Sequence, residues 1–405
     1  MRKNIAHPLI LLLAAAVINA APVPAGTLEK IDLFEAGLEG YALYRIPGIV
    51  VSKSGAVLAY CEARKSDKGD WGPIDILMRR SFDGGVSWAP RQTIVHLEGE
   101  HPVNPVAAAQ KLDRPGENTA NNAAAIADME TGAVHLVYCL EYMRCFYIRS
   151  DDDGSTWSRP VEITATFDKF RPEYDWKVIA TGPAHGIQLV RGTKKGRLVV
   201  PIWMSLGTGG HAHRPSVNGT IFSDDHGKTW QRGAIAIPDS PPVRYPNETV
   251  IVQLSDGRVM LNARSESDAH RRLVTISDDG ATGWSSARFD DALLEPICMA
   301  SIVRVDDRHI AFANPHNLSR KDGKEAPGKP RDRINVSIKL SSDDGATWPV
   351  NRLLENGFSG YSDLAVTRDG TILCFYERGA TDGANIYKTG RLTVARFGLQ
   401  WLMGE

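Results

Sequence analysis

The sequence predicts an all-β fold assembled from repeated hairpins, and three observations support this prediction. The pattern Ser-x-Asp-x-Gly-x-(Ser/Thr)-Trp occurs four times, and a fifth copy is altered. Short apolar runs rich in β-branched and aromatic residues precede the copies, as expected for strands. Turn residues recur from about residue 41 to 397, with no long amphipathic helix. Repetition at this scale is typical of a radial or stacked array of one supersecondary unit.

The repeated octapeptide predicts a tight turn that closes a hairpin. Its regular copies begin at Ser81, Ser150, Ser223 and Ser341, and the altered copy begins at Ser277. In each copy the aspartate can accept backbone N–H bonds, the glycine permits positive φ, and the tryptophan can pack back onto the sheet. The altered copy has Ala281 where glycine is expected. We interpret the repeat as structural, without a catalytic role.

The spacing of the repeats predicts the number of blades. Strand-like runs precede the copies at residues 76–78, 145–148, 220–222, 273–276 and 334–340. Five repeats, with strands before the first and after the last, predict a six-bladed β-propeller of four-stranded antiparallel blades. A repeat fold can hold residues 26–405 as one domain, with residues 392–397 closing the ring beside the N-terminal strand. The stretches 91–122 and 314–331 lack strand character, and long loops on a regular scaffold are often functional.

Composition and the N-terminus exclude some function classes. The formal net charge of -1 gives no basic footprint for nucleic acid. Residues 1–20 have the layout of a secretory signal peptide, with basic residues at 2–3, an apolar stretch at 8–18 and small residues at 20–21. This stretch is short for a transmembrane helix, and a retained anchor is the alternative. We expect a secreted or periplasmic protein without stable membrane insertion, monomeric because a closed propeller leaves few edges to pair.

The cysteines and histidines do not predict a metal site. The cysteines are Cys61, Cys139, Cys145, Cys298 and Cys374. Most lie in apolar runs, where a thiol behaves as a small hydrophobe, so we expect them to be mostly free and buried; one disulfide is possible. No zinc-type spacing occurs, and the pair His211 and His213 in a glycine-rich loop is interpreted as loop surface. No metal or organic cofactor is expected.

Three arginines lie within or beside strand-like sequence, namely Arg45, Arg264 and Arg333. Arginine is costly to bury unless it is paired. Strand ends converge on an axis in a radial fold, so the three side chains can form one cluster. Such a cluster would bind an anion, above all a carboxylate through bidentate hydrogen bonds. The alternative is three arginines on exposed strand faces.

Further segments accompany these arginines in a specific order. They are residues 44–48, 182–188, 261–265, 361–364 and 376–378. With the octapeptides, known as Asp boxes or BNR repeats, they resemble the exo-α-sialidases (neuraminidases) of glycoside hydrolase family 33, which are six-bladed β-propellers. The resemblance covers nearly all of the chain past its first segment. It implies that Arg45, Arg264 and Arg333 grip the carboxylate of sialic acid and that Glu377 braces Arg45.

The resemblance also implies a general acid/base. Asp70 lies eleven positions before Ser81, where the family carries this residue on a mobile loop. Asp67 and Asp75 are the competing carboxylates, and ordinary solvated loop groups are the alternative interpretation for both. Arg64 resembles an additional arginine that contacts the substrate near this loop.

The resemblance further implies that Tyr361 is the nucleophile and Glu248 its base. A sialoside carries a carboxylate on its anomeric carbon, so a neutral phenol avoids the repulsion that a carboxylate nucleophile would meet, and a glutamate can take its proton. The alternatives are a core aromatic at Tyr361 and a loop residue at Glu248. Candidates for the wall that holds the N-acetyl group are Trp71, Trp203 and Met204.

These residues together predict hydrolysis of terminal α-linked sialic acid with retention, through a covalent tyrosyl-sialyl intermediate. The expected partners are sialylated glycans, glycoproteins or glycolipids. An intramolecular trans-sialidase or a transferase of the same fold is the first alternative. A non-catalytic sialic-acid-binding propeller and a purely structural propeller are the others. His185, expected near the pocket rim, has no assigned role.

Overall fold

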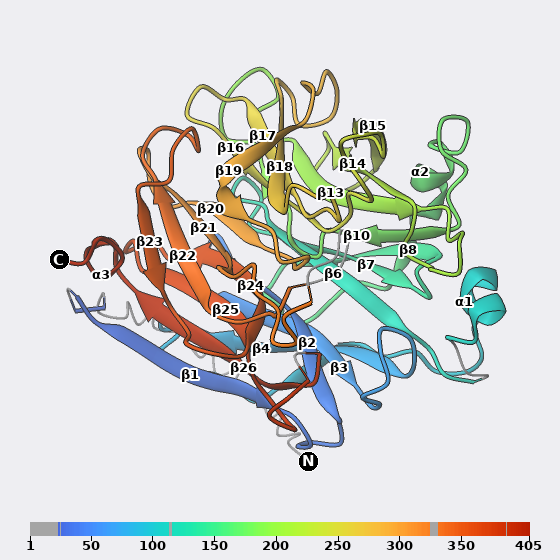
Figure 1. Ribbon diagram of the computed structural model, residues 1–405, viewed down its shortest axis with the longest axis horizontal. Coiled ribbons are helices and arrows are strands. Elements are labelled where there is room, and N and C mark those ends of the chain that lie inside the picture. Colours follow the sequence, from blue (N-terminus) through green and yellow to red (C-terminus); the bar gives the residue numbers. More distant parts are fainter. Residues whose placement is uncertain (1–22, 25, 113–115, 325–330, 386) are drawn as a thin grey trace, which may run out of the picture.

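The computed structural model describes residues 23–24, 26–112, 116–324, 331–385 and 387–405. Six sheets are arranged radially around one axis (Figure 1). The predicted six-bladed β-propeller is therefore confirmed, except that two blades have a fifth short strand. The predicted signal peptide, residues 1–20, lies outside the described residues.

The first half of the chain forms three blades. Blade 1 consists of β2 (Leu43–Val51), β3 (Val57–Arg64), β4 (Ile74–Ser81) and β5 (Gln92–Val95). Blade 2 consists of β6 (Ala120–Ala127), β7 (Val134–Leu140), β8 (Arg144–Ser150) and β9 (Val161–Glu162), with β11 (Ala184–His185) parallel to β6. Blade 3 consists of β10 (Val178–Thr181), β13 (Leu198–Ser205), β14 (Ser216–Ser223) and β15 (Gln231–Ile237), with β12 (Ile187–Gln188) paired to β13.

The second half forms the other three blades. Blade 4 consists of β16 (Thr249–Gln253), β17 (Val259–Ala263), β18 (Arg271–Ser277) and β19 (Arg288–Leu294). Blade 5 consists of β20 (Ser301–Arg304), β21 (Ile310–Pro315), β22 (Val336–Ser341) and β23 (Val350–Leu353). Blade 6 consists of β24 (Ser359–Val366), β25 (Ile372–Ala380), β26 (Thr389–Phe397) and β1 (Leu28–Glu35). The helices are short: α1 (Pro105–Gln110), α2 (Thr164–Asp168) and α3 (Leu399–Met403).

Strands from the two ends of the described chain close the ring. β1 pairs antiparallel with β26, in a register that places Leu28 opposite Phe397 and Glu35 opposite Arg391. This confirms the closure predicted for residues 392–397. Because blade 6 takes its outer strand from the N-terminal side, it has no turn between third and fourth strands. Six blades therefore need only five Asp boxes.

Each Asp box links the third strand of a blade to the fourth. In blade 3, Ser223 Oγ donates to Asp225 Oδ1 (2.8 Å) and accepts from the Gly227 N–H (2.8 Å). Asp225 also accepts from the Thr229 N–H (2.9 Å) and hydroxyl (2.6 Å). The other regular copies repeat these contacts. The box therefore satisfies the turn's own donors, as the structural interpretation requires.

The altered box keeps eight residues from Ser277 to Trp284, but its turn is tighter by one residue, and its glycine is displaced rather than lost. Gly280, at φ +71°, donates its N–H to Ser277 Oγ at 3.1 Å. Asp279 accepts from the N–H groups of Ala281 (2.8 Å) and Thr282 (2.7 Å). The interpretation of Ala281 as a glycine replacement was therefore wrong, because Gly280 supplies the positive φ one position earlier.

The antiparallel order separates the two ends of the propeller. The start of each first strand and the turn between the second and third strands lie at one end, and the turn between the third and fourth strands lies at the other. The Asp boxes therefore occupy one end. Every predicted site residue lies at the opposite end, near the start of a first strand, at a second strand's end or in the turn that follows.

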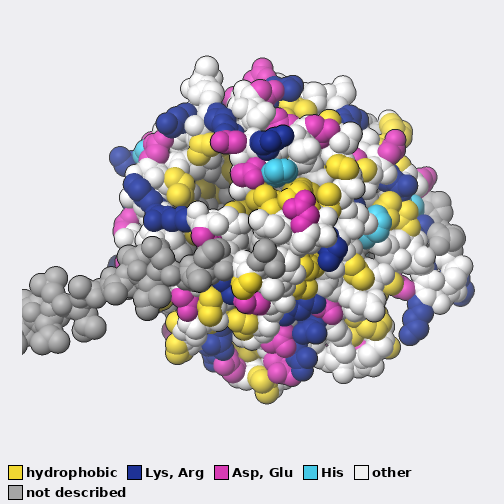
Figure 2. Space-filling model, turned by 90° about the vertical axis from the view of Figure 1, so that its left-hand side faces the viewer, with side chains coloured by type: hydrophobic (Ala, Val, Ile, Leu, Met, Phe, Trp, Pro, Cys, Tyr) yellow, Lys and Arg dark blue, Asp and Glu magenta, His cyan; other side chains and the backbone are white. Residues whose placement is uncertain are grey.

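Apolar contacts between neighbouring sheets form the core. Because the blades cover both faces of a central strand, β3 is buried at every position, and its residues 57–61 form a continuous apolar run rather than an alternating one. Phe34, Tyr44 and Phe375 pack in one such layer between blades 1 and 6. On the face drawn in Figure 2, basic and acidic side chains are interspersed. No helix in the described part of the chain is long and apolar enough to cross a membrane.

Candidate active site

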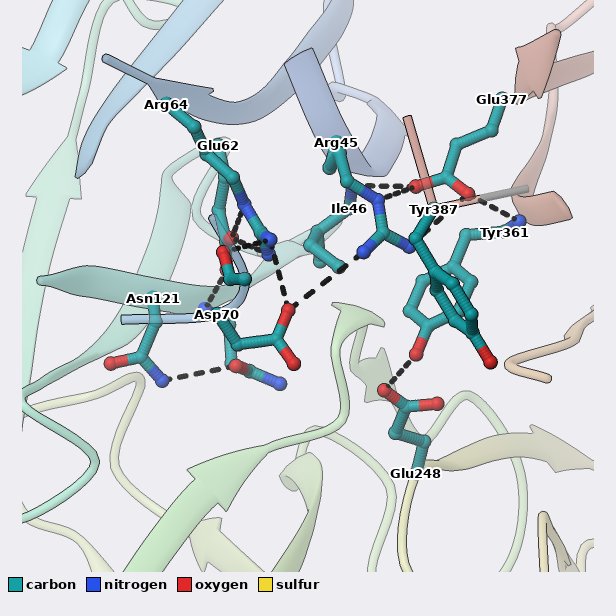
Figure 3. A network of polar contacts seen from close by, with 12 residues as sticks. Arg45, Ile46, Glu62, Arg64, Asp70, Asn121, Glu248, Tyr361, Glu377 and Tyr387 are labelled. Carbon is teal, nitrogen blue, oxygen red and sulfur yellow. Dashed lines mark hydrogen bonds and ion pairs between the residues drawn. The ribbon is translucent and has the colours of Figure 1, made fainter. Parts of the chain in front are cut away.

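A cavity of about 510 Å³ lies where the first strands begin, and it gathers the predicted site residues. Seven of them line it, namely Arg45, Arg64, Asp70, Glu248, Arg264, Arg333 and Tyr361. They come from blades 1, 4, 5 and 6, so only the closed ring brings them together. The eighth, Glu377, lies beneath the cavity and contacts two of them (Figure 3).

Glu377 holds both Arg45 and the backbone of Tyr361. Its Oε1 accepts from Arg45 Nε (2.9 Å) and its Oε2 from the Tyr361 N–H (3.1 Å). Its side chain is only 2% exposed. A buried guanidinium or carboxylate is costly unless it is paired with an opposite charge. The contacts therefore agree with the predicted role of Glu377 in bracing Arg45. A larger residue at Gly360 would displace this carboxylate, because a Cβ there would lie 2.5 Å from Glu377 Oε2.

Bulges at the cavity end of first strands aim the functional groups. The pairing of β2 with β3 shifts between Arg45 and Gly48, and Ile46 adopts φ +56°. The pairing of β24 with β25 shifts between Ser359 and Ser362, on either side of Tyr361. Bulges re-aim side chains and are frequent near functional sites. A β-branched residue at positive φ is strained. The strain at Ile46 is consistent with a backbone conformation that the functional site imposes.

Tyr361, Glu248 and Arg264 form a hydrogen-bonded triangle. The phenol donates to Glu248 Oε1, and Arg264 Nη1 contacts both Glu248 Oε2 and the phenolic oxygen, the latter at 2.9 Å. Burial and the Glu248 charge raise the pKa of Tyr361 well above its usual value, against the opposing pull of the nearby arginines. The phenol is therefore protonated at rest, and the carboxylate that accepts its hydrogen bond can take its proton.

The predicted arginines converge on the ring of Tyr361. The guanidinium carbons of Arg45 and Arg333 lie 5.1 and 4.9 Å from the ring centroid. Arg333 Nη2 donates to the carbonyl of Ile297 (2.9 Å). Among the described residues, no carboxylate pairs with Arg333, and the Nε atoms of Arg264 and Arg333 have no acceptor. Three cations that share so few carboxylates are suited to hold an anion.

Asp70 lies on the loop between β3 and β4 and contacts two arginines. Arg64 Nη1 donates to Asp70 Oδ1 (2.9 Å), and Arg45 Nη1 is 3.7 Å from the same oxygen. The Asp70 side chain remains 44% exposed. Burial raises the pKa of Asp70, but Arg64, Arg45 and His213 outweigh this effect and lower it overall. Asp70 is therefore ionised at neutral pH in the free protein.

Glu62 was not singled out by the sequence, although it supports this corner of the site. Its Oε2 accepts from Arg64 Nη2 (2.6 Å) and Nε (3.1 Å), and its Oε1 accepts from the Asn122 N–H (2.9 Å). Arg64 therefore connects a buried glutamate to the loop aspartate (Figure 3). The sequence contained a signal for Glu62, because it precedes Arg64 by two residues on β3. Residues i and i+2 of a strand lie on the same face.

The alternative carboxylates have other roles. Asp67 lies at the cavity rim and pairs with Lys388 at 2.8 Å. Asp75 is not a solvated loop group, because it is buried on β4 and accepts from the Tyr41 hydroxyl at 2.6 Å. Asp67 and Asp70 both line the cavity, but Asp70 is the one that contacts Arg64 and Arg45.

The remaining predictions had mixed outcomes. Trp203 lines the cavity, Trp71 lines an adjacent one, and Met204 is fully buried and lines neither, so its assignment was wrong. His185 is not at the rim; it is buried against Asp363 at 2.7 Å. His213 is not plain loop surface, because it packs among aromatic rings. The cysteines are free and buried, and the described residues contain no metal-binding group of three or more ligands.

The fold and the site together define a β-propeller with an arginine-rich pocket around a tyrosine–glutamate pair. Residues 70–374 match the model of the BNR repeat-like domain family, so the chain belongs to that family. It is 30% identical to a sialidase of Micromonospora viridifaciens over 96% of its own length, and 27% identical to a sialidase of Bacteroides fragilis (strain YCH46) over 84%. It spans only 57% and 61% of the lengths of these two relatives.

A solved structure agrees with these relatives. The chain resembles the Hadza microbial sialidase Hz136 with a TM-score of 0.70 and 26% identity, over 91% of this chain and 68% of that one. The resemblance to sialidases predicted from the motifs is thereby confirmed.

Proposed function

We propose that this protein is an exo-α-sialidase, which hydrolyses terminal α-linked sialic acid from glycoconjugates with retention of configuration. One observation carries the proposal: a tyrosine bonded to a glutamate lies at the centre of three converging arginines. A carboxylate-bearing sugar would be held by the arginines with its anomeric carbon beside the phenol. The similarity to sialidases supports this assignment.

In the first step, the bond between the anomeric carbon and the glycosidic oxygen breaks. Asp70, in its protonated form, gives its proton to that oxygen, and the leaving alcohol departs. The phenolic oxygen of Tyr361 bonds to the anomeric carbon while Glu248 accepts the phenolic proton. The neutral nucleophile approaches a carbon that carries a carboxylate, which explains why a tyrosine replaces the usual carboxylate.

In the second step, Asp70 acts as a base. It takes a proton from water, whose oxygen attacks the anomeric carbon as the bond to Tyr361 breaks. Glu248 returns its proton to the phenolate. Two inversions leave sialic acid with its original anomeric configuration, and each group regains its starting protonation. Binding of the substrate carboxylate to Arg45 would weaken that cation's hold on Asp70, which assists protonation of the acid in the complex.

The proposal extends to the partners, the location and the oligomeric state of the protein. Sialylated glycans, glycoproteins or glycolipids are the proposed partners, and the basic and apolar N-terminal residues support export to the periplasm or the medium. The chain is proposed to act as a monomer.

The decisive experiment identifies the sugar released from 4-methylumbelliferyl α-N-acetylneuraminide by mass spectrometry. We expect free sialic acid from the wild type and almost none from Tyr361→Phe. Tyr44→Phe is the matched control, since it loses a hydroxyl whose partner among the described residues is the Leu38 carbonyl. An anhydro sugar would instead indicate an intramolecular trans-sialidase. Saturable binding of sialic acid without turnover would indicate a lectin-like propeller.

A further inference from the structure

Two of the five cysteines lie directly opposite each other in one hairpin. Cys139 on β7 and Cys145 on β8 are register partners in this antiparallel pair. Both side chains are fully buried in the apolar layer between blades 2 and 3. The other cysteines in described strands, Cys61 and Cys374, have leucine or alanine opposite them, and Cys298 lies outside the strands. The facing pair is therefore specific to this hairpin.

The backbone hydrogen bonds place this pair at the closer of the two spacings found in antiparallel sheets. The Cys145 N–H donates to Thr164 Oγ1 (2.9 Å), and the Cys145 carbonyl accepts from the Ile163 N–H (2.8 Å). Both groups point away from β7, so Cys139 and Cys145 form a non-hydrogen-bonded pair. The Cα atoms of such a pair are about 4.5 Å apart, and a disulfide spans Cα separations of about 4.4–6.8 Å. The separation of the strands therefore suits a bond between the two sulfurs.

The folded protein shields these thiols from later chemistry. Burial raises the pKa of Cys145 well above its usual value, and a hydrogen bond with the Cys139 thiol raises it further. The nucleophile in thiol–disulfide exchange is the thiolate, so oxidation belongs to the stage of folding before blades 2 and 3 pack together. Only five residues separate the two cysteines. The hairpin can therefore bring them together at this stage, because hairpins form from local contacts.

The turn of the same hairpin forms part of the cavity around Tyr361. Tyr142 lies in this turn and lines the cavity. Its ring is 4.7 Å from Trp71 and 5.0 Å from His213, centroid to centroid. Glu141 and Tyr142 adopt φ values of +55° and +49°, which residues other than glycine seldom adopt. A covalent link at the base of this turn would oppose its opening.

We propose that Cys139 and Cys145 form a disulfide as the protein folds in an oxidising compartment, and that this bond holds the hairpin that carries Tyr142. The inference rests on the export proposed above, because disulfides form and persist mainly outside the cytosol. It does not depend on the proposed sialidase activity. The structure, in which the cysteines are free, corresponds to the reduced form.

The oxidant in this step is itself a disulfide, either glutathione disulfide or the disulfide of an oxidising protein. One cysteine thiolate attacks a sulfur of the oxidant, which forms a mixed disulfide and expels one thiolate. The other cysteine thiolate attacks the protein's own sulfur in the mixed disulfide and expels the second thiolate. The two cysteines lose two electrons, the oxidant is reduced to two thiols, and the two cysteine protons pass to those thiols.

Peptide mapping of the full chain tests the bond directly. The unfolded, reduced chain is refolded in a buffer of reduced and oxidised glutathione, alkylated in denaturant without reduction, and digested with trypsin. Trypsin cuts after Arg144, so Cys139 and Cys145 fall on different peptides. We expect these two peptides to stay joined until a reductant is added. Two separate alkylated peptides, or glutathione adducts on them, would overturn the proposal.

Thermal unfolding and hydrogen exchange test whether the bond holds the hairpin. The chain refolded with glutathione disulfide should melt about 2–4 °C above the chain refolded with dithiothreitol, and its amides at 141–143 should exchange more slowly. Both differences should vanish in the double variant Cys139→Ala, Cys145→Ala. They should persist in Cys61→Ala, the matched control, since Cys61 is also buried but faces no cysteine. Identical melting and exchange in the two wild-type preparations would overturn the holding role.

Mapping of the chain recovered from cells separates this proposal from the proposed function. In a bacterial host with a periplasm, the exported chain should carry the joined peptides. A chain found only in the cytosol would overturn the export on which the inference rests, and the refolding experiment would still decide whether the cysteines pair. Absence of sialidase activity would refute the proposed function and would leave the peptide map unchanged.

Discussion

Arg264 Nη1 lies 2.9 Å from the phenolic oxygen of Tyr361. The same nitrogen contacts Glu248, which accepts the phenol's hydrogen bond. A cation at this position stabilises the phenolate as its proton passes to the glutamate. The contact therefore joins one cation of the proposed anion site to the proposed nucleophile in one geometry.

Trapping should identify Tyr361 as the nucleophile. A 2,3-difluorosialic acid should raise the intact mass of the wild type by one 3-fluorosialyl unit, because the fluoride on the anomeric carbon leaves, whereas Tyr361→Phe should show no adduct. Turnover in that variant should fall at least about 10³-fold, because the atom that forms the covalent bond is gone. Peptide mapping locates the label. A label on Glu248, or an adduct in Tyr361→Phe, would contradict the assignment.

Glu377→Gln should damage stability and activity together. The substitution leaves Arg45 buried without its strongest counter-charge, and breaking a buried pair costs about 3–5 kcal/mol. Urea unfolding measures the loss. Glu39→Gln is the control, because Glu39 pairs with Arg79 at the surface and should lose less than about 1 kcal/mol. Full activity in Glu377→Gln would show instead that Glu377 serves shape rather than charge.

The alkaline limb of the kcat–pH profile should depend on Arg64. Arg64, Arg45 and His213 lower the pKa of Asp70, so a variant without the Arg64 charge keeps Asp70 protonated to higher pH. We expect Arg64→Gln to move the limb towards alkaline pH, although the rate itself will fall. Burial already raises the pKa of Glu62, so that group can take a proton when Arg64 is absent.

A profile measured between about pH 4 and 9 tests this expectation. Arg80→Gln is the control, because Arg80 bonds to Ser155 at the Asp-box end. An unmoved limb in Arg64→Gln would mean that another group controls it.

Removing the aspartate of an Asp box should lower the free energy of unfolding without changing catalysis. In Asp225→Ala the Thr229 N–H and hydroxyl and the Ser223 hydroxyl lose their acceptor, which should cost about 1–3 kcal/mol. The box lies at the end of the propeller opposite the cavity. The free energy of unfolding should therefore fall while KM and kcat stay within about twofold at temperatures below the transition. A selective change in KM would contradict a purely structural role.

Lys339→Met should stabilise the protein, and the gain should depend on pH. Lys339 is 2% exposed, its Nζ has no hydrogen-bond partner among the described residues, and burial lowers its pKa to about 8. The folded state therefore disfavours the charged form. The penalty is full below about pH 8 and disappears as pH approaches the unfolded value of about 10.4. Unfolding at pH 7 and pH 10 measures the difference, and an equal gain at both values would refute the charge argument.

The repeats explain why so much of the fold could be predicted. Strand propensity and the Asp-box turn act within about ten residues, so the copies at Ser81, Ser150 and Ser223 could be recognised without any distant contact. The altered copy was misinterpreted at Ala281, since a turn shortened by one residue moves the glycine to Gly280. The short fifth strands carry too little pattern to be recognised locally.

The site was predictable only where residue type and motif coincided. Arginines in apolar sequence are unusual, which drew attention to Arg45 and Arg264. Met204 was misassigned and His213 dismissed, because the face of a strand and the packing of a loop depend on neighbours from other blades. No local pattern distinguishes a histidine in solvent from one among aromatic rings.

By itself, the sequence determined the hairpin repeats, the number of blades and the residue types available for an anion site. These follow from short-range backbone preferences and from the cost of burying charge. Only the tertiary structure decided that Arg45 meets Glu377 across 332 positions of the chain, and that Asp70 borders two cavities. Closure of the ring brings those groups together, and it depends on the packing of all six blades at once.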